Sequence, residues 1–355
     1  MVGRLRTSTL QLPEDDAGSR DADEDAWQAL LDRGWSDGLP VVAPTPERVE
    51  RMLGGREPDR VHVVLGGDSP GAMYKLGNPG AEATFGLIAA NAVMAGCRPE
   101  YFPAVLAALS GVVANGNGAG FLGPVAPMLV FSGPVRRELG INCSHDMLSM
   151  VDRANATIGR AVRLVIRNVA GAKGDRLFDV QHGMPGRASM VFGEHEEESP
   201  WPPFVEGSAV TVFGAWGSMP VNYHQVPQRV EELRLILARC LDYVRGNRLG
   251  PWPDTSAVVV LSPKHARAFA AEGWSRAQVE DDLTTAVNDH HPIELPSIAE
   301  KLELINRGRG PDEPPLTIPM PEDRVRVLVA GGVAGWHSLM IPVRANAAPV
   351  TVPIV

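Results

Sequence analysis

The chain has 355 residues, 44% apolar and 21% charged, which is typical of a globular protein with a large core. Its 33 basic and 42 acidic residues give a net charge of −9, which disfavours nucleic acid and anionic membranes as partners. The N-terminus lacks the apolar core of a secretory signal, and no apolar run reaches the about 20 residues that span a bilayer. We therefore expect a cytoplasmic protein that binds a small-molecule substrate, as a monomer or a homo-oligomer.

The N-terminal part of the chain begins with a polar, acidic stretch and then turns to helical signals. Residues 1–23 show no hydrophobic period, which predicts a disordered tail. A short helix is expected at 24–33. An extended segment at 39–43 then leads to Thr45 and Pro46, which have the residue types of a helix N-cap and a first helical position.

The same strand-cap-helix order returns near the C-terminal third. A strand expected at 258–261 leads into Ser262 as the cap and Pro263 as the first helical residue. Such units predict an α/β fold, with a mixed or mostly parallel sheet flanked by helices. The segments 61–67 and 325–332 resemble one another as buried strands that end in Gly-Gly, which suggests an internally duplicated α/β unit.

The residues from 24 to 355 are expected to form one enzyme-like unit. If this unit divides into two subdomains, the boundary is expected near 246–256, which is rich in glycine, proline and charge.

Hydrophobic periodicity predicts the remaining long elements. The expected helices are 82–95, 99–115, 151–169 and 228–245, and the other expected strands are 128–131, 188–192, 209–213 and 326–329.

The three cysteines are too few and too widely spaced for a disulfide framework. Cys97 stands between Gly96, a residue type that ends helices, and Arg98, just before an expected helix N-terminus. A nearby cation and a helix N-terminus both favour the thiolate, so Cys97 is a candidate nucleophile or acid/base. The alternative is a small buried hydrophobe at a tight helix junction. Cys240 falls on the apolar stripe of its helix and is expected in the core.

Cys143 belongs to a run of four chemically active residue types, Cys143-Ser144-His145-Asp146. His145 is a candidate base that Asp146 would orient. The alternative is a polar loop that caps the next helix, since catalytic groups usually converge from distant positions.

An acidic segment follows the strand expected at 188–192. Period-two alternation places Glu194, Glu196 and Glu198 on one side and His195 and Glu197 on the other. Crowded carboxylates raise one another's pKa, which suits a general acid, or they bind a divalent metal. The alternative is a solvated acidic loop.

Two glycine-rich stretches are candidate ligand loops. The stretch 116–123 contains a formal G-x-G-x-x-G, but it follows a helical run rather than a strand, so we interpret it as a pocket-lining loop and not as a dinucleotide site. The stretch 331–338 follows the last expected strand, where ligands of open α/β sheets bind.

Basic, amide and aromatic groups near these segments are candidates for substrate binding. Arginines on the 151–169 helix have the donors to hold a carboxylate or phosphate, and ion pairing with acidic neighbours is the alternative. The expected substrate-binding residues are Arg153, Asn155, Arg160, Trp201, His337 and Ser338.

Six stretches together resemble a known family. The sequence is similar to a bacterial family of unassigned function that is associated with the selenoprotein-like proteins named for a UGSC motif. The resemblance spans most of residues 35–355 and implies a single enzyme-like unit with thiol or redox chemistry. The UGSC motif itself is absent, since no Cys-Gly-Ser-Cys occurs in this chain. The stretches are 37–42, 91–101, 133–142, 153–160, 196–201 and the Gly-Gly-x-x-Gly-x-His-Ser pattern that ends at 338.

Three hypotheses follow for the function. The leading one is a cofactor-independent, lyase-like enzyme on a small organic acid or a specialised-metabolism intermediate. The second is a metal-dependent hydrolase with a divalent metal at His195, Glu194 and Glu197, joined by His145. The third is a non-catalytic ligand-binding or partner protein. The catalytic residues of the leading hypothesis are Cys97, His145, Glu194 and Glu197.

Overall fold

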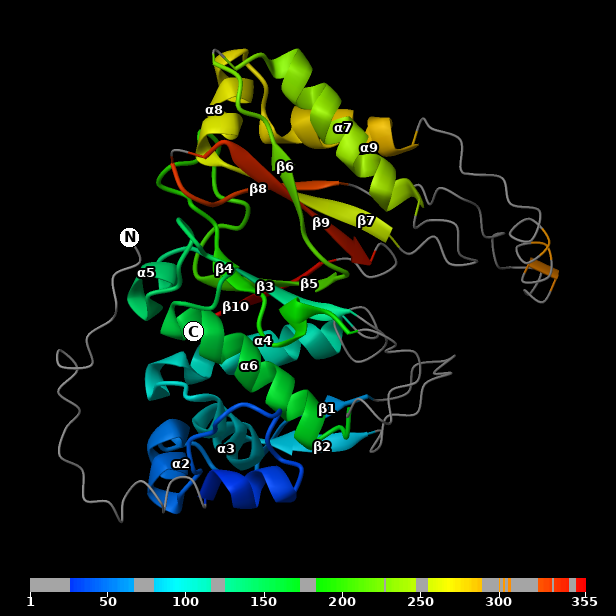
Figure 1. Cartoon of the computed structure of the whole chain (residues 1–355). Coiled ribbons are helices and arrows are strands. Elements are labelled where there is room, and N and C mark those ends of the chain that lie inside the picture. The colour runs from blue at the N-terminus through cyan, green and yellow to red at the C-terminus, as the bar shows by residue number, and fades with distance from the viewer. Residues whose placement is uncertain are drawn as a thin grey trace, which may run out of the picture.

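The structure is a computed structural model with a mixed α/β fold, in which a mixed parallel and antiparallel sheet is flanked by helices (Figure 1). The predicted tail at 1–23 and the glycine-rich stretch at 116–123 lie outside the described residues. The structure describes residues 26–66, 80–115, 125–172, 183–226, 228–246, 255–288, 300, 303, 306–307, 325–333, 335–344 and 349–355.

Eight strands form the main sheet in the order β4-β3-β5-β9-β7-β8, with β10 beside β5 and β6 beside β9. Strands β5 and β9 share one residue pair, Ala215 with Val343, so the sheet consists of two half-sheets joined at this point. The first half-sheet is β4-β3-β5-β10 and the second is β8-β7-β9-β6. The strands are β3 (Ala126–Ser132), β4 (Val191–Gly193), β5 (Ala209–Ala215), β6 (Met219–Asn222), β7 (Thr255–Leu261), β8 (Arg326–Val329), β9 (His337–Arg344) and β10 (Val350–Pro353).

The two half-sheets have the same internal arrangement. Each begins with a parallel pair, β3 with β4 or β7 with β8, and adds an antiparallel neighbour, β5 or β9. The fourth strand of each half-sheet does not pair with the strand that it follows in the chain. Strand β6 lies between β5 and β7 in the chain and pairs with β9, whereas β10 follows β9 and pairs with β5.

The half-sheets face one another across a shared core, and helices cover their outer faces (Figure 1). On β3, Met128 and Val130 point into the core between the half-sheets, while Leu129 and Phe131 point into the core beneath the helices. This alternation follows from the two-residue period of a strand. The covering helices are α4 (Phe102–Ala114) and α6 (Arg153–Asn168) on the first half-sheet, and α7 (Val230–Gly246), α8 (Pro263–Ala271) and α9 (Arg276–Asn288) on the second.

A smaller layer lies beyond α4 and α6 (Figure 1). Residues 26–32 are helical, and β1 pairs with β2 in a separate two-stranded antiparallel sheet. Among the described residues, no helix is both long enough and apolar enough to cross a membrane. The remaining elements are α2 (Pro46–Leu53), β1 (Val61–Leu65), β2 (Ala81–Thr84), α3 (Phe85–Ala95), η2 (Pro99–Tyr101), α5 (Val135–Leu139) and η4 (Pro185–Arg187).

The capping predictions are confirmed. The hydroxyl of Thr45 accepts a hydrogen bond from Arg48 N at the start of α2, and that of Ser262 accepts one from His265 N at the start of α8. In each helix, proline follows the cap at a position whose N–H would lack a helical partner.

Three other expectations are wrong. Residues 39–43 form no strand, and 82–84 belong to β2 rather than to a helix. The segments 61–67 and 325–332 are not equivalent either. Strand β1 lies in the small antiparallel sheet, whereas β8 is a parallel strand of the main sheet. Internal duplication is therefore not shown.

Candidate functional site

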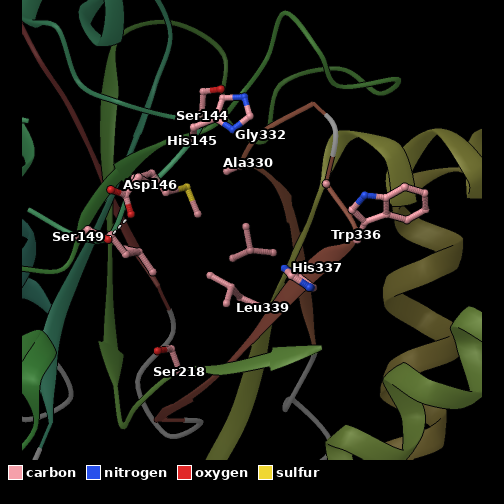
Figure 2. A pocket seen from close by; sticks show the side chains of 15 residues that line it. Ser144, His145, Asp146, Ser149, Ser218, Ala330, Gly332, Trp336, His337 and Leu339 are labelled. Carbon is pink, nitrogen blue, oxygen red and sulfur yellow. Dashed lines mark hydrogen bonds between the residues drawn. The ribbon is translucent and has the colours of Figure 1, made fainter. Parts of the chain in front are cut away.

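A cavity of about 630 Å³ opens between the half-sheets, beyond the carboxyl ends of β7 and β8 (Figure 2). This is the edge at which α/β sheets hold ligands. Three walls form it: the loop 144–149, the segment around β8 and β9, and the turn before β6. The lining residues are Ser144, His145, Asp146, Met147, Leu148, Ser149, Ser218, Val260, Ala330, Gly331, Gly332, Gly335, Trp336, His337 and Leu339.

The loop that carries Cys143 and His145 is fixed by a buried amide. Asn155, on α6, is 2% exposed, and its Nδ2 donates to the carbonyls of Asn142, Met147 and Val191. Its Oδ1 accepts a hydrogen bond from Asn142 N at 2.8 Å. The predicted substrate-binding residue Asn155 therefore positions the loop and does not face the cavity.

His145 is exposed at the cavity wall, where its ring packs against Gly332 (Figure 2). A Cβ atom at position 332 would overlap this ring, so a larger residue there would displace His145 from its place. Asp146 has φ +61°, in the left-handed region, and accepts a hydrogen bond from Ser149. A non-glycine residue in that region marks a locally constrained backbone, which fits a loop shaped around a site.

Next to the cavity wall, three side chains bring a sulfur, a nitrogen and an oxygen together. Single donor atoms of Cys143, His195 and Glu197 all lie within 4.8 Å of one another. The backbone of Gly331, which lines the cavity, joins two of them. Gly331 N donates to Cys143 O at 2.8 Å, and its carbonyl faces His195 Nδ1 at 3.1 Å.

The hydrogen bond to Gly331 determines the tautomer of His195. A carbonyl oxygen only accepts, so Nδ1 carries the proton and donates it. In the neutral ring, Nε2 then holds a free lone pair. His195 is thus prepared to accept a proton, or to bind a metal, through Nε2.

Arg136 is the cation of this cluster. Its side chain is 2% exposed and reaches the carboxylates of Glu196 at 2.7 Å and Glu197 at 3.1 Å. Nη1 also lies 3.9 Å from Cys143 Sγ, and it donates to the carbonyl of Glu194 at 2.7 Å. These bonds hold the 194–197 segment against the Cys143 loop and place a positive charge beside the thiol.

The charge state of the thiol follows from two opposing influences. Burial raises the pKa of Cys143, and the positive charge of Arg136 opposes that rise without cancelling it. The resting group is therefore a thiol, which needs a base in order to react. Hydrogen bonds from Arg136 lower the pKa of Glu197, so this carboxylate stays ionised.

Cys97 lies apart from this cluster. It is 7% exposed in the core around α3, α4 and α6, and its Sγ donates to Thr157 O at 3.3 Å. Burial raises its pKa to about 12. The expected convergence of Cys97 with His145 and Glu194 is not found, because Cys97 lies in the helical core. The thiol also stays protonated, because desolvation outweighs the nearby arginines that favour the thiolate.

Glu194 and Trp201 also have structural surroundings. Glu194 is fully buried, pairs with Arg276 at 2.6 Å and accepts a hydrogen bond from Phe204 N. Trp201 is 9% exposed in the core beneath α7 to α9, and its Nε1 donates to Trp274 O. Neither lines the cavity described above.

The two predicted arginines contact protein groups rather than the cavity. Arg153 donates to Gly96 O, and Arg160 pairs with Asp37 at 2.7 Å. For Arg160, the alternative of ion pairing is the one observed. His337 lines the cavity, whereas its neighbour Ser338 is 1% exposed and bonds the buried His265.

Sequence reasoning placed His195 and Glu197 together but did not connect Cys143 with them, and it did not identify Arg136. No local signal identifies Arg136, because its carboxylate partners Glu196 and Glu197 lie 60 and 61 positions away in the sequence. Comparison with protein-family models and with curated proteins gives no match to this sequence.

Proposed function

We propose that this chain is a cofactor-independent, lyase-like enzyme that uses Cys143 and His195 as an acid/base pair on a small organic acid. The observation that carries the proposal is the placement of a thiol, an oriented imidazole and a buried guanidinium within one cluster beside a cavity of small-molecule size. The cavity matches the usual size of a metabolite site.

The reaction begins with proton transfer from Cys143 Sγ to His195 Nε2. Arg136 and the new imidazolium both stabilise the thiolate. The thiolate then removes a proton from the carbon next to the substrate carboxylate. The electron pair of that C–H bond forms the carbon–carbon double bond, and the leaving hydroxyl takes the imidazolium proton and departs as water. The products are an unsaturated acid and water, and the enzyme returns to its thiol and neutral imidazole.

The position of the other cysteines favours proton transfer over a dithiol cycle. All three cysteines of the chain are free, and Cys97 and Cys240 belong to other parts of the molecule, one in the core beneath α4 and α6 and the other on α7. Cys143 therefore has no internal partner for disulfide exchange.

The test uses a panel of small hydroxy acids in D2O. NMR measures how much deuterium each acid incorporates at the carbon next to the carboxylate. We expect the wild-type chain to exchange at least one member. Cys143→Ala and His195→Gln should each slow that exchange by about 10²-fold or more. Cys240→Ser is the matched control and should keep the wild-type rate.

A second measurement needs no substrate. Alkylation of Cys143 by iodoacetamide, followed by mass spectrometry at pH 7, should be about tenfold slower in His195→Gln, because the general base is lost. Equal alkylation rates in the two proteins, or exchange that survives in Cys143→Ala, would refute the proposal.

A metal-dependent hydrolase is the second candidate, because Cys143, His195 and Glu197 offer sulfur, nitrogen and oxygen donors that suit Zn²⁺. The bond from His195 Nδ1 to a backbone carbonyl is also usual for a metal-binding histidine. The guanidinium of Arg136 disfavours this candidate, since it already binds Glu197 and stands 3.9 Å from the sulfur. Stoichiometric zinc that Cys143→Ser releases, together with zinc-dependent hydrolysis, would establish it instead.

A further inference from the structure

A second pair of donor atoms lies at the edge of the cavity, which one of the two residues lines. His224 follows β6, and His337 begins β9 and lines the cavity (Figure 2). Their Nε2 atoms are 3.0 Å apart and their ring centroids 5.0 Å apart. Both side chains are exposed, so the pair is open to solutes.

The spacing suits two nitrogens on one metal ion. Imidazole nitrogens bind divalent transition metals at about 2.0–2.1 Å, so two of them at a right angle around one ion lie about 3.0 Å apart. Between two neutral rings, one Nε2–H donates to the other Nε2. A shift of that proton to Nδ1 of the same ring frees both lone pairs, and a rotation of the two exposed rings then directs them at one ion.

The backbone on each side of the pair is already fixed by His265. This residue is fully buried, and its two ring nitrogens contact Tyr223 O at 3.2 Å and Ser338 Oγ at 2.7 Å. Tyr223 precedes His224 in the chain, and Ser338 follows His337. Tyr223 N also donates to Trp336 O, so both histidines extend from backbone that is held in place. Such preorganisation reduces the entropy lost when a ligand binds.

We propose that His224 and His337 form a two-histidine site for a divalent transition metal at the edge of the cavity. Water or a cavity ligand completes the coordination. The imidazole donors suit Ni²⁺, Cu²⁺ or Zn²⁺ and not Mg²⁺ or Ca²⁺, which prefer oxygen. This site is distinct from the Cys143 cluster, and the proposed acid/base reaction does not require it.

The test is isothermal titration calorimetry of Ni²⁺ into the full-length chain without an affinity tag. We expect one Ni²⁺ per chain, and His224→Ala or His337→Ala should weaken binding by more than about tenfold. His145→Ala is the matched control, since it removes an exposed cavity histidine outside the pair. Cys143→Ser separates the two clusters, and both of these controls should bind Ni²⁺ like the wild type.

Circular dichroism of each variant checks that the fold is kept, and the nickel d–d spectrum provides a readout that is independent of stability. Absence of stoichiometric binding in the wild type would overturn the proposal. So would binding that survives in both His224→Ala and His337→Ala, or that disappears in Cys143→Ser.

Discussion

His265 shows how one residue sets both local order and the response to pH. Its Nε2 faces a carbonyl and must donate, so Nδ1 accepts from the Ser338 hydroxyl. Burial lowers the pKa of His265 to about 4, from 6.5 in the unfolded chain. The folded protein therefore keeps this ring neutral at pH values where the unfolded chain protonates it.

We expect this difference to destabilise the fold in acid. Well above pH 6.5 the ring is neutral in both states, so it does not change the free energy of unfolding. As the pH falls towards 4, only the unfolded chain gains the proton, and the free energy of unfolding drops by about 3 kcal/mol in total. Urea unfolding between pH 7 and 4 measures the slope. The same series on His265→Gln should be flatter by that amount, and parallel slopes would contradict the assignment.

The candidate site illustrates what residue types in a sequence can and cannot reveal. The chemistry of His195 and Glu197 was recognisable, and alternation placed them on a common side. The sequence does not show that Cys143, more than 50 positions away, joins them, because this contact depends on how β3 and β4 pair. The opposite error at Cys97 has a physical cause: a helix N-terminus favours a thiolate only where solvation or charge offsets burial.

At the scale of elements, the close packing of α6 against β4 depends on Gly159. A Cβ atom at this position would overlap the Ser189 hydroxyl and come within 2.8 Å of Val191 Cγ2. Glycine is unfavourable inside a helix, so its presence here reflects close packing. The same helix carries Asn155, which holds the Cys143 loop.

Gly159→Ala should therefore separate α6 from β4 and lower the free energy of unfolding by about 1–3 kcal/mol, despite the better helix propensity of alanine. Gly217→Ala is the control, because a Cβ there meets no atom within 4 Å. Chemical denaturation of both variants tests this, and a Gly159→Ala protein as stable as the wild type would show that the helix can shift without cost.

Elements with a local signal were predictable, and elements defined by distant partners were not. Caps placed the starts of α2 and α8, and apolar runs placed β3, β5 and β7. No strand is predicted at β9, because glycines precede it and its pairing with β7 and β6 leaves no local pattern. Short β6 and β10 carry even less local signal.

For the whole molecule, a buried ion pair connects the two half-sheets. Glu194 follows β4 in the first, and Arg276 begins α9 on the second. Burial raises the pKa of Glu194, although the charge of Arg276 opposes this rise. A carboxylate without solvent is costly unless its cation is present.

Arg276→Met should lower the free energy of unfolding by about 3–5 kcal/mol, because it leaves Glu194 buried and unpaired. The double variant Glu194→Gln/Arg276→Met should regain most of that loss, since the glutamine oxygen still accepts from Phe204 N. Thermal denaturation of the two proteins provides the comparison. Additive losses in the double variant would mean that the pair is not the source of the effect.

The positions of β6 and β10 in the chain order have a consequence for how the chain can be divided. The four strands of the second half-sheet, β6 to β9, are consecutive in the chain, whereas the first half-sheet needs β10, which lies beyond them, in addition to β3, β4 and β5. A chain that ends before β10 would therefore keep every strand of the second half-sheet, but it would leave β5 without its antiparallel partner β10 along 209–212.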